Sequence, residues 1–182
     1  MLKLLSKLKD KKIIGIDGEP ATGKSTLAMY IKNNLDVSVV SIDDFYLPIE
    51  KRNESAFIRG GNNIDYKRLI EEVISKHLKK KDLEYASYNC KTNMFDKIIT
   101  QNYKPILIIE GTYSLRKELF DYYDFKILLK VDKSIQLSRL ESKRNFEDFL
   151  KRWIPLSRNY IIDNQLESKV DEIIKSKTLP LR

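Results

Sequence analysis

The sequence predicts an α/β fold of three layers, in which a parallel sheet of about five strands is flanked by helices. Apolar runs of strand length alternate with segments of helical periodicity, which is the pattern of repeated βαβ units. Two of these runs, 105–111 and 125–131, are almost continuously apolar, as strands covered on both faces are. The chain of 182 residues has the length of one domain, so we predict a single domain over 1–182.

The individual elements follow from periodicity and turn residues. Residues 2–8 carry leucines at helical spacing with lysines between them, which predicts an amphipathic helix lying on the domain; a helix on a membrane surface is the alternative. Asp65 is in position to cap a helix, and Pro155 is expected to end one. We expect strands at 12–17, 37–42, 105–111 and 125–131, helices at 26–35 and 64–81, and a helix or a pair of helices at 134–150. Residues 170–174 are expected to form the last strand, with the end of a helix as the alternative.

Composition excludes several classes of protein. Cys90 and His77 are the single cysteine and histidine, too few for a structural zinc site or an internal disulfide. No apolar run reaches the roughly 18 residues of a membrane helix, and the lysines in 1–12 leave no signal-peptide core, so we expect a soluble, cytoplasmic protein without membrane partners. The net charge of +8 suits anionic partners. The lysines are spread along the whole chain, which disfavours nucleic acid among them.

The most specific motif lies between the first strand and the first long helix. Residues 18–25 satisfy G-x-x-x-x-G-K-[ST], here called the phosphate-binding loop. Its glycines let consecutive backbone N–H groups face a polyphosphate, Lys24 would contact the β and γ phosphates, and the Ser25 hydroxyl would bind Mg²⁺. The predicted ligand is a nucleoside triphosphate, bound by Gly18, Glu19, Pro20, Ala21, Thr22, Gly23, Lys24, Ser25 and Thr26.

Three carboxylates follow predicted strands. Glu110 ends the apolar run 106–109, and Asp43 and Asp44 follow the β-branched run 37–42. Parallel strands end at one edge of a sheet, where α/β proteins bind ligands, so we expect these carboxylates to converge there. Glu110 and Asp44 are candidate Mg²⁺ ligands, and Asp43 could accept the proton of an attacking hydroxyl, although the sequence does not separate the roles of Asp43 and Asp44.

A GTPase switch does not fit this sequence. Such proteins need a D-x-x-G segment, and none of the six glycines has an aspartate three residues before it. Residues 168–171 echo the guanine-reading N-K-x-D motif, but the first residue is serine. The remaining classes are a kinase, or a nucleotide-binding regulatory protein without turnover.

Several segments together point to one family. They are Asp17-Gly18 with Gly23-Lys24-Ser25-Thr26, then Ile42-Asp43-Asp44-Phe45-Tyr46, and then Glu110-Gly111-Thr112-Tyr113. These segments resemble the uridine kinase and phosphoribulokinase family of P-loop kinases. Gly60-Gly61-Asn62 and Arg152-Trp153-Ile154-Pro155-Leu156 are similar to its bacterial uridine kinase-like branch. The likeness spans nearly the whole chain after residue 12.

The resemblance implies an ATP-dependent kinase that uses Mg²⁺ and phosphorylates a small-molecule hydroxyl. It implies that Asp43 is the base, that Tyr46 shapes the acceptor pocket, and that Arg139 and Arg144 belong to a helical lid over about 139–158. By the same likeness, 60–66 and 85–90 line the acceptor pocket, with Asn62 and Tyr88 as acceptor contacts; as plain sequence, 85–90 is a tyrosine-rich loop.

The acceptor is less defined than the reaction. The 5′-hydroxyl of uridine or cytidine is expected first, and pantothenate, a sugar or a sugar phosphate are alternatives. Arg59, Asn89 and Phe146 stand where the family pattern leads us to expect Pro, Asp and Gly. The acceptor therefore stays open, as do the choice between ATP and GTP and a homo-oligomeric state.

Overall fold

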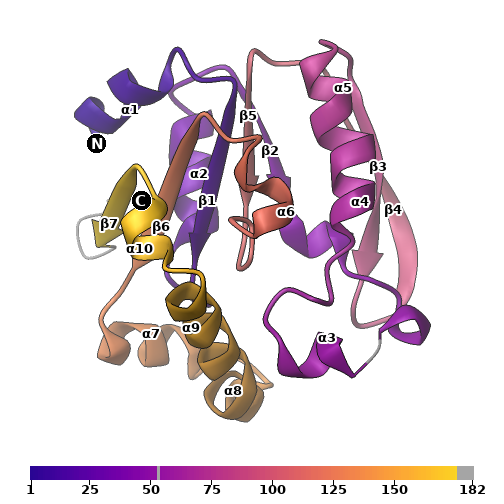
Figure 1. The fold of residues 1–182 in the computed structure, drawn as a ribbon, viewed down its shortest axis with the longest axis vertical. Helices are drawn as coiled ribbons and strands as arrows, with labels where there is room; N and C mark the ends of the chain where they lie inside the picture. The colour runs from indigo at the N-terminus through magenta and orange to yellow at the C-terminus, as the bar shows by residue number, and fades with distance from the viewer. Residues whose placement is uncertain (53, 176–182) are drawn as a thin grey trace.

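The computed structural model describes residues 1–52 and 54–175, and a five-stranded parallel sheet forms its centre (Figure 1). The strand order is β2-β5-β1-β6-β7, so the first strand lies in the middle of the sheet. The predicted fold class is confirmed, with each expected strand within two residues of its predicted limits. The strands are β1 (Ile13–Gly18), β2 (Val37–Ser41), β5 (Ile106–Glu110), β6 (Phe125–Lys130) and β7 (Glu172–Lys175).

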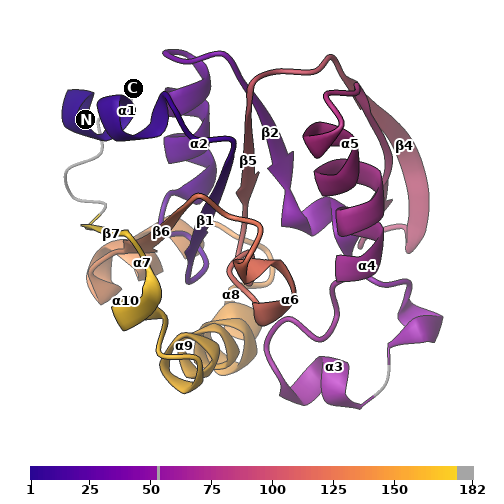
Figure 2. The same ribbon diagram turned by 45° about the horizontal axis from the view of Figure 1, so that its top comes forward.

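Helices cover both faces of this sheet, as Figure 2 shows from a second direction. Helices α1 (Leu2–Leu8) and α2 (Lys24–Lys32) pack on one face, where Ile14 of β1 is buried. The helix that begins with α4 (Tyr66–Leu69), together with α6 (Lys117–Phe120), packs on the other face, around Ile13. The alternating burial of successive β1 residues explains why the central strands are apolar throughout. The leucines of α1 face this core, as expected of a helix lying on the domain.

A two-stranded hairpin beside the sheet is an element that the sequence pattern does not predict. Residues 85–90 lie mostly in β3 (Leu83–Asn89), which pairs antiparallel with β4 (Met94–Gln101). The expectation of a loop was therefore wrong. Most side chains of β4 are exposed, so this strand lacks the apolar alternation that reveals a half-buried strand in a sequence. The hairpin lies against the helix formed by α4, a π turn (Ile70–Ile74) and α5 (Ser75–Leu78) (Figure 1).

Asp65 caps the helix that begins with α4, as predicted. Its side chain accepts a hydrogen bond from the Arg68 backbone N–H at 3.0 Å. Two short turns and one short helix connect β2 to α4. They are the 3-10 turns Ile42–Phe45 and Ile49–Lys51 and the helix α3 (Ser55–Ile58).

The segment after β6 corrects the prediction about Pro155. Helix α7 (Lys133–Leu140) ends before a short loop, after which α8 (Phe146–Asp148), a π turn (Phe149–Trp153) and α9 (Ile154–Asp163) follow without a break. Pro155 therefore lies inside a helix and does not end it. The π turn widens the helix immediately before the proline, where a regular α-helix would press a carbonyl against the ring. Helix α10 (Leu166–Lys169) leads into β7.

A buried carboxylate joins the sheet to its helical cover. Asp17 of β1 is fully buried and accepts hydrogen bonds from the backbone N–H groups of Gly18, Tyr113 and Leu115 and from the Tyr160 hydroxyl of α9, at 2.6–3.0 Å. Burial raises the pKa of this carboxyl, and the hydrogen bonds and the Lys24 ammonium act in the opposite direction. Asp17 thereby fixes the end of β1, the 113–115 loop and α9 relative to one another. Among the described residues, no helix is long and apolar enough to cross a membrane.

We expect Tyr160→Phe to lower the free energy of unfolding by about 1.5–3 kcal/mol, because a buried charged acceptor loses a donor. The measurement is urea-induced unfolding followed by circular dichroism. Tyr122→Phe is the matched control, since the Tyr122 side chain is 39% exposed, and it should leave the unfolding midpoint unchanged. Equal stability of Tyr160→Phe and the wild type would show that Asp17 does not depend on this bond.

Candidate active site

The phosphate-binding loop leaves the carboxyl end of β1 and enters α2 directly. Gly18 and Gly23 have φ of 152° and 98°, and Gly23 is the N-terminal cap of α2. A Cβ added at Gly18 would lie 2.4 Å from the Leu129 carbonyl oxygen, so this position has no room for a side chain. The loop therefore folds as the motif predicts, with the positive end of a helix at its exit.

Lys24 is folded back onto the loop. Its ammonium donates to the carbonyl oxygens of Gly18 and Glu19, both at 2.9 Å, and to the Thr112 hydroxyl at 3.1 Å. Burial lowers the pKa of this ammonium, while the charges of Asp17, Glu110, Asp43 and Glu19 oppose that change, in decreasing order. Lys24 is thus a buried cation whose partners in this state are neutral oxygens of its own loop and of the segment that follows β5.

Ser25 and Glu110 form a polar pair beside Lys24. The Ser25 hydroxyl donates to Glu110 Oε1 at 2.9 Å, and Glu110 ends β5 at the same edge of the sheet as the loop. Burial raises the pKa of Glu110, and the bond from Ser25 and the charge of Lys24 partly offset this. No group of three histidine, cysteine, aspartate or glutamate side chains that could hold a metal occurs within 1–52 and 54–175. One hydroxyl and one carboxylate are the set that Mg²⁺ uses when nucleotide phosphates and water complete its coordination.

Asp43 faces the same space from the turn after β2. Its side chain is open to solvent at the cavity. Desolvation by the surrounding protein nevertheless raises the pKa of its carboxyl, and the positive charge of Lys24 opposes this rise. The neighbouring Tyr46 hydroxyl also lowers the pKa of this carboxyl, and the Ser41 hydroxyl accepts a hydrogen bond from the Asp43 backbone N–H at 3.3 Å. Asp43 is therefore positioned by its own turn, within electrostatic reach of the loop lysine.

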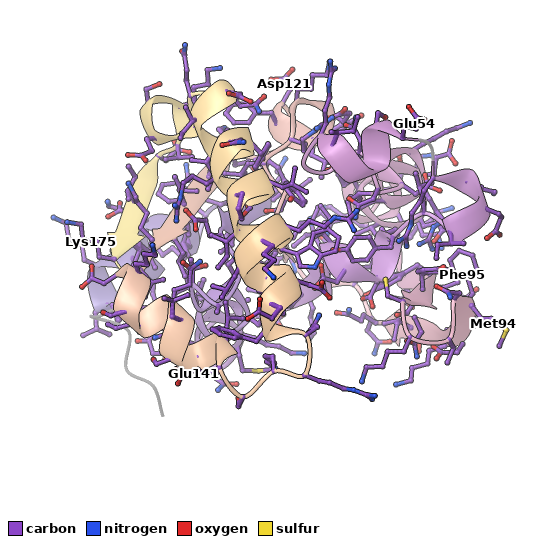
Figure 3. The ribbon with its side chains drawn as sticks, turned by 90° about the horizontal axis from the view of Figure 1, so that it is seen from below. Glu54, Met94, Phe95, Asp121, Glu141 and Lys175 are labelled. Carbon is purple, nitrogen blue, oxygen red and sulfur yellow. The ribbon has the colours of Figure 1, made fainter. Side chains whose placement is uncertain are left out.

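One cavity of about 680 Å³ is lined by eight of the seventeen predicted site residues. Its volume is typical of sites for small molecules. It lies between α7 with the loop after Glu141 on one side and the hairpin that carries Met94 and Phe95 on the other (Figure 3). The predicted site residues that line it are Pro20, Ala21, Lys24, Ser25, Asp43, Tyr46, Glu110 and Arg139.

Asp44 does not line the cavity in this structure. Its carboxylate accepts hydrogen bonds from the Ser87 and Tyr85 hydroxyls of β3, and its carbonyl oxygen accepts one from Arg68. Two of the three predicted carboxylates, Asp43 and Glu110, thus meet in the cavity. Asp44 instead joins the turn after β2 to the hairpin.

Among the loop residues, Glu19 and Thr22 line a second, neighbouring cavity, and Gly18, Gly23 and Thr26 line neither. Three predicted residues outside the loop also lie elsewhere. The Asn62 amide donates to the Ser55 hydroxyl at 3.3 Å, and Tyr88 is buried against Phe95 with ring centroids 5.4 Å apart. Arg144 is exposed in the loop between α7 and α8. Arg139 lines the cavity, but one of its N–H groups donates to the Ala21 carbonyl oxygen at 2.9 Å.

The structure adds cavity residues that the sequence analysis did not select as site residues. Asn63 is 4% exposed and lies next to Asn62 in the segment that the family likeness had already indicated. Arg52 is held by a 2.7 Å bond from its Nε to the Leu47 carbonyl oxygen, and its guanidinium lies over the Tyr46 ring. The one feature of the sequence that could have pointed to Arg52 is its position shortly after the Asp43–Tyr46 motif. The added residues are Arg52, Asn63, Cys90, Gly111, Thr112, Tyr113, Leu140, Lys143, Phe149 and Trp153.

The chain is similar in sequence or in fold to several known proteins. The chain is 30% identical over 141 residues to uridine-cytidine kinase A of Dictyostelium discoideum, covering 72% of this chain but 28% of that relative. It is 26% identical to dephospho-CoA kinase of Borreliella burgdorferi, covering 91% and 86%. A solved structure described as a "possible uridine kinase" from Bacillus stearothermophilus shares the fold with a TM-score of 0.70, at 18% identity and coverage of 94% and 95%.

The family itself is shown by a match to a family model. Residues 13–145, which include the phosphate-binding loop, Asp43 and Glu110, match the Phosphoribulokinase / Uridine kinase family. This match covers well over half of the chain. The chain therefore belongs to the Phosphoribulokinase / Uridine kinase family of P-loop kinases.

Proposed function

We propose that this protein transfers the γ-phosphoryl group of ATP to a hydroxyl of a small molecule, and that the first acceptor to test is the 5′-hydroxyl of uridine or cytidine. The observation that supports this proposal best is the shared cavity. A cation for phosphates, Lys24, and a carboxylate for a hydroxyl proton, Asp43, face one space of substrate size.

The two substrates of this reaction would occupy opposite ends of the cavity. At the loop end, backbone N–H groups and Lys24 bind the β and γ phosphates. At the other end, the acceptor hydroxyl oxygen forms a bond to the γ-phosphorus while the bond from that phosphorus to the ADP oxygen breaks. Asp43 accepts the hydroxyl proton, a contribution of roughly 10²–10⁴-fold in general base catalysis. Arg139 and Arg144 are proposed lid cations, and reaching the phosphate would require Arg139 to leave the Ala21 carbonyl.

Ser25 and Glu110 are the residues that would hold magnesium, because they provide a hydroxyl and a carboxylate 2.9 Å apart beside the loop. When bound there, the ion supplies positive charge that neutralises the phosphate oxygens. Asp44 is not needed for this role, since its carboxylate is already held by Ser87 and Tyr85.

The acceptor end supports an aromatic or hydroxylated ligand. Tyr46, Tyr113 and Trp153 provide ring surface on which a base can stack, and Asn63 and Arg52 provide hydrogen-bond donors. The relatives named above include kinases of uridine and cytidine and a dephospho-CoA kinase. A nucleoside is therefore the leading acceptor class, with other hydroxylated metabolites to be compared with it.

We expect ADP production to depend on the acceptor. Purified protein with ATP and Mg²⁺ is mixed in turn with uridine, cytidine, pantothenate, dephospho-CoA and sugar phosphates, and ADP is measured by a coupled assay. Stimulation by uridine or cytidine above all others supports the proposal. Stimulation by another acceptor supports the reaction and corrects its substrate, whereas RNA binding without any ADP release would indicate a regulatory protein without turnover.

Lys24→Ala should reduce kcat/KM by on the order of 100-fold, or about 3 kcal/mol of transition-state stabilisation, because the phosphates lose a buried charged donor. Steady-state kinetics with the best acceptor provide the measurement. Lys32→Ala removes an equal charge from the exposed far end of α2 and should behave as the wild type. Activity of Lys24→Ala at the level of this control would contradict the phosphate role.

Asp43→Asn should retain ATP binding and lose phosphoryl transfer by roughly 100-fold or more, because the amide cannot accept the proton. The pKa of Asp43 is raised, so wild-type kcat/KM should fall on the acid side at a higher pH than an ordinary aspartate would produce, as the base becomes protonated. Kinetics from about pH 4 to 8, with ADP affinity measured in parallel, check both statements. An unchanged kcat in Asp43→Asn would remove Asp43 from the role of base.

A further inference from the structure

We propose that Arg158 of α9 is a positioning residue that neutralises an acid inside the phosphate-binding loop, and that without this neutralisation the loop would repel the phosphates it binds. This inference rests on the proposed function, because it concerns how the same loop accepts a polyphosphate. It assigns a role to a pair of residues, Glu19 and Arg158, that the transfer reaction itself does not use.

Glu19 is a residue that a phosphate site should exclude. It is the second residue of the loop, directly after Gly18, and a carboxylate at that place adds negative charge beside an anionic ligand. Its charge reaches the site, since it is one of the four charges that raise the pKa of Lys24. The Lys24 ammonium also bonds the Glu19 carbonyl oxygen at 2.9 Å. The loop therefore carries an electrostatic cost unless Glu19 is compensated.

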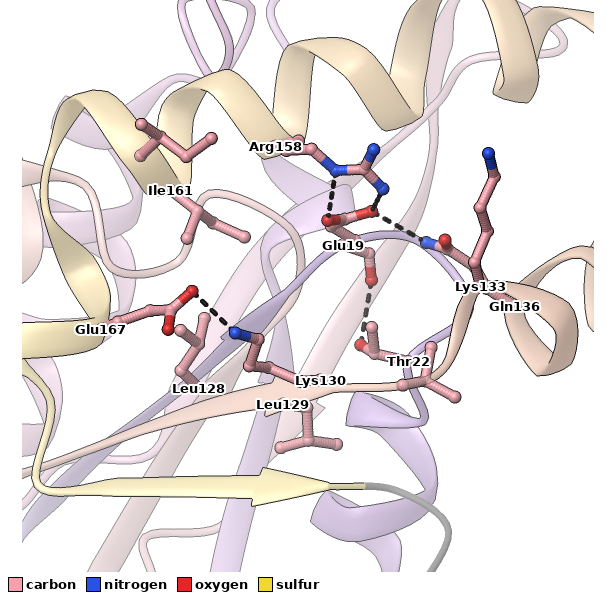
Figure 4. Close-up of a pocket in the computed structure, with 12 residues that line it drawn as sticks. Glu19, Thr22, Leu128, Leu129, Lys130, Lys133, Gln136, Arg158, Ile161 and Glu167 are labelled. Atoms are coloured by element: carbon pink, nitrogen blue, oxygen red, sulfur yellow. Dashed lines mark hydrogen bonds and ion pairs between the residues drawn. The ribbon is translucent and has the colours of Figure 1, made fainter.

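Arg158 provides that compensation in a two-pronged pair (Figure 4). Its Nε donates to Glu19 Oε1 and its Nη2 to Glu19 Oε2, both at 3.1 Å. The side chain of Glu19 is 20% exposed and that of Arg158 is 47% exposed, so the pair is only partly screened by water. A bidentate arginine holds both carboxylate oxygens in one plane, which fixes their direction as well as their charge.

The pair also turns the carboxylate to the outer side of the loop. Gln136 of α7 donates from its amide nitrogen to Glu19 Oε2 at 3.1 Å (Figure 4). The same nitrogen donates to the Pro20 carbonyl oxygen at 2.9 Å. Arg139, one turn further along α7, donates to the Ala21 carbonyl oxygen. Donors from α7 and α9 thus occupy the Glu19 carboxylate and the carbonyl oxygens of Pro20 and Ala21.

The cavity next to this pair offers a matched control. Lys130 and Glu167 form a second ion pair at 2.7 Å, and all four charged residues line one cavity (Figure 4). Arg158→Ala and Lys130→Ala each remove one positive charge and leave one carboxylate without its cation. In the first variant that carboxylate belongs to the phosphate-binding loop, whereas in the second it belongs to α10. A general effect of charge would weaken both variants equally.

The experiment measures the affinity for ADP with Mg²⁺ by isothermal titration calorimetry at low ionic strength, where exposed charges are least screened. We expect Arg158→Ala to raise the dissociation constant about ten-fold and Lys130→Ala to change it less than about two-fold. Glu19→Gln should bind ADP at least as tightly as the wild type. The double variant Glu19→Gln with Arg158→Ala should return to within about two-fold of Glu19→Gln alone, because no acid is left to neutralise.

This rescue separates neutralisation from a merely structural role, because removing the charge of Glu19 cannot restore packing that α9 owes to the Arg158 side chain. A double variant as weak as Arg158→Ala, or an Arg158→Ala variant that binds like the wild type, would overturn the inference while leaving the proposed function intact. Failure of the wild type to bind ADP would overturn both. Arg158→Gln carries the same expectation if Arg158→Ala does not fold.

Discussion

A loop that binds phosphate through its backbone N–H groups must turn its carbonyl oxygens away from the phosphate. Each of these oxygens then needs a hydrogen-bond donor from another part of the protein. This constraint organises the active-site end of the molecule. Four successive carbonyl groups, from Gly18 to Ala21, are all satisfied by side chains. The donors are Lys24 and Thr112 at Gly18, Lys24 and Thr22 at Glu19, Gln136 at Pro20, and Arg139 at Ala21.

Several features of the fold follow from this constraint. Helices α7 and α9 must lie close to the loop, although more than one hundred residues separate them from it in sequence. Asp17 holds α9 in place through Tyr160, and it holds the 113–115 loop through two backbone bonds. The buried carboxylate at the end of β1 therefore serves the phosphate-binding loop that begins at the next residue. Stability of the domain and geometry of the site depend on the same group.

The sequence predicts what has strong local causes. The apolar runs of the central sheet, the glycines of the loop and the Asp65 cap each reflect a local requirement, and the structure confirms them. The β3–β4 hairpin was missed because its exposed outer strand has no apolar alternation. The prediction that Pro155 ends a helix was wrong because the π turn that accommodates the proline is a change of the backbone, and no residue type in the sequence marks it. The different directions of Asp43 and Asp44 depend on Ser87 and Tyr85, which are distant in sequence.

The proposed reaction requires that the loop bind a triphosphate whose end lies across from Asp43. The most direct measurement is a crystal structure with Mg²⁺ and a non-hydrolysable ATP analogue. In that complex we expect the Lys24 ammonium to leave the Gly18 and Glu19 carbonyl oxygens for the β and γ phosphates, with the γ phosphate on the side of the cavity that Asp43 lines. An analogue bound away from residues 18–25, with Lys24 still on those carbonyl groups, would contradict it.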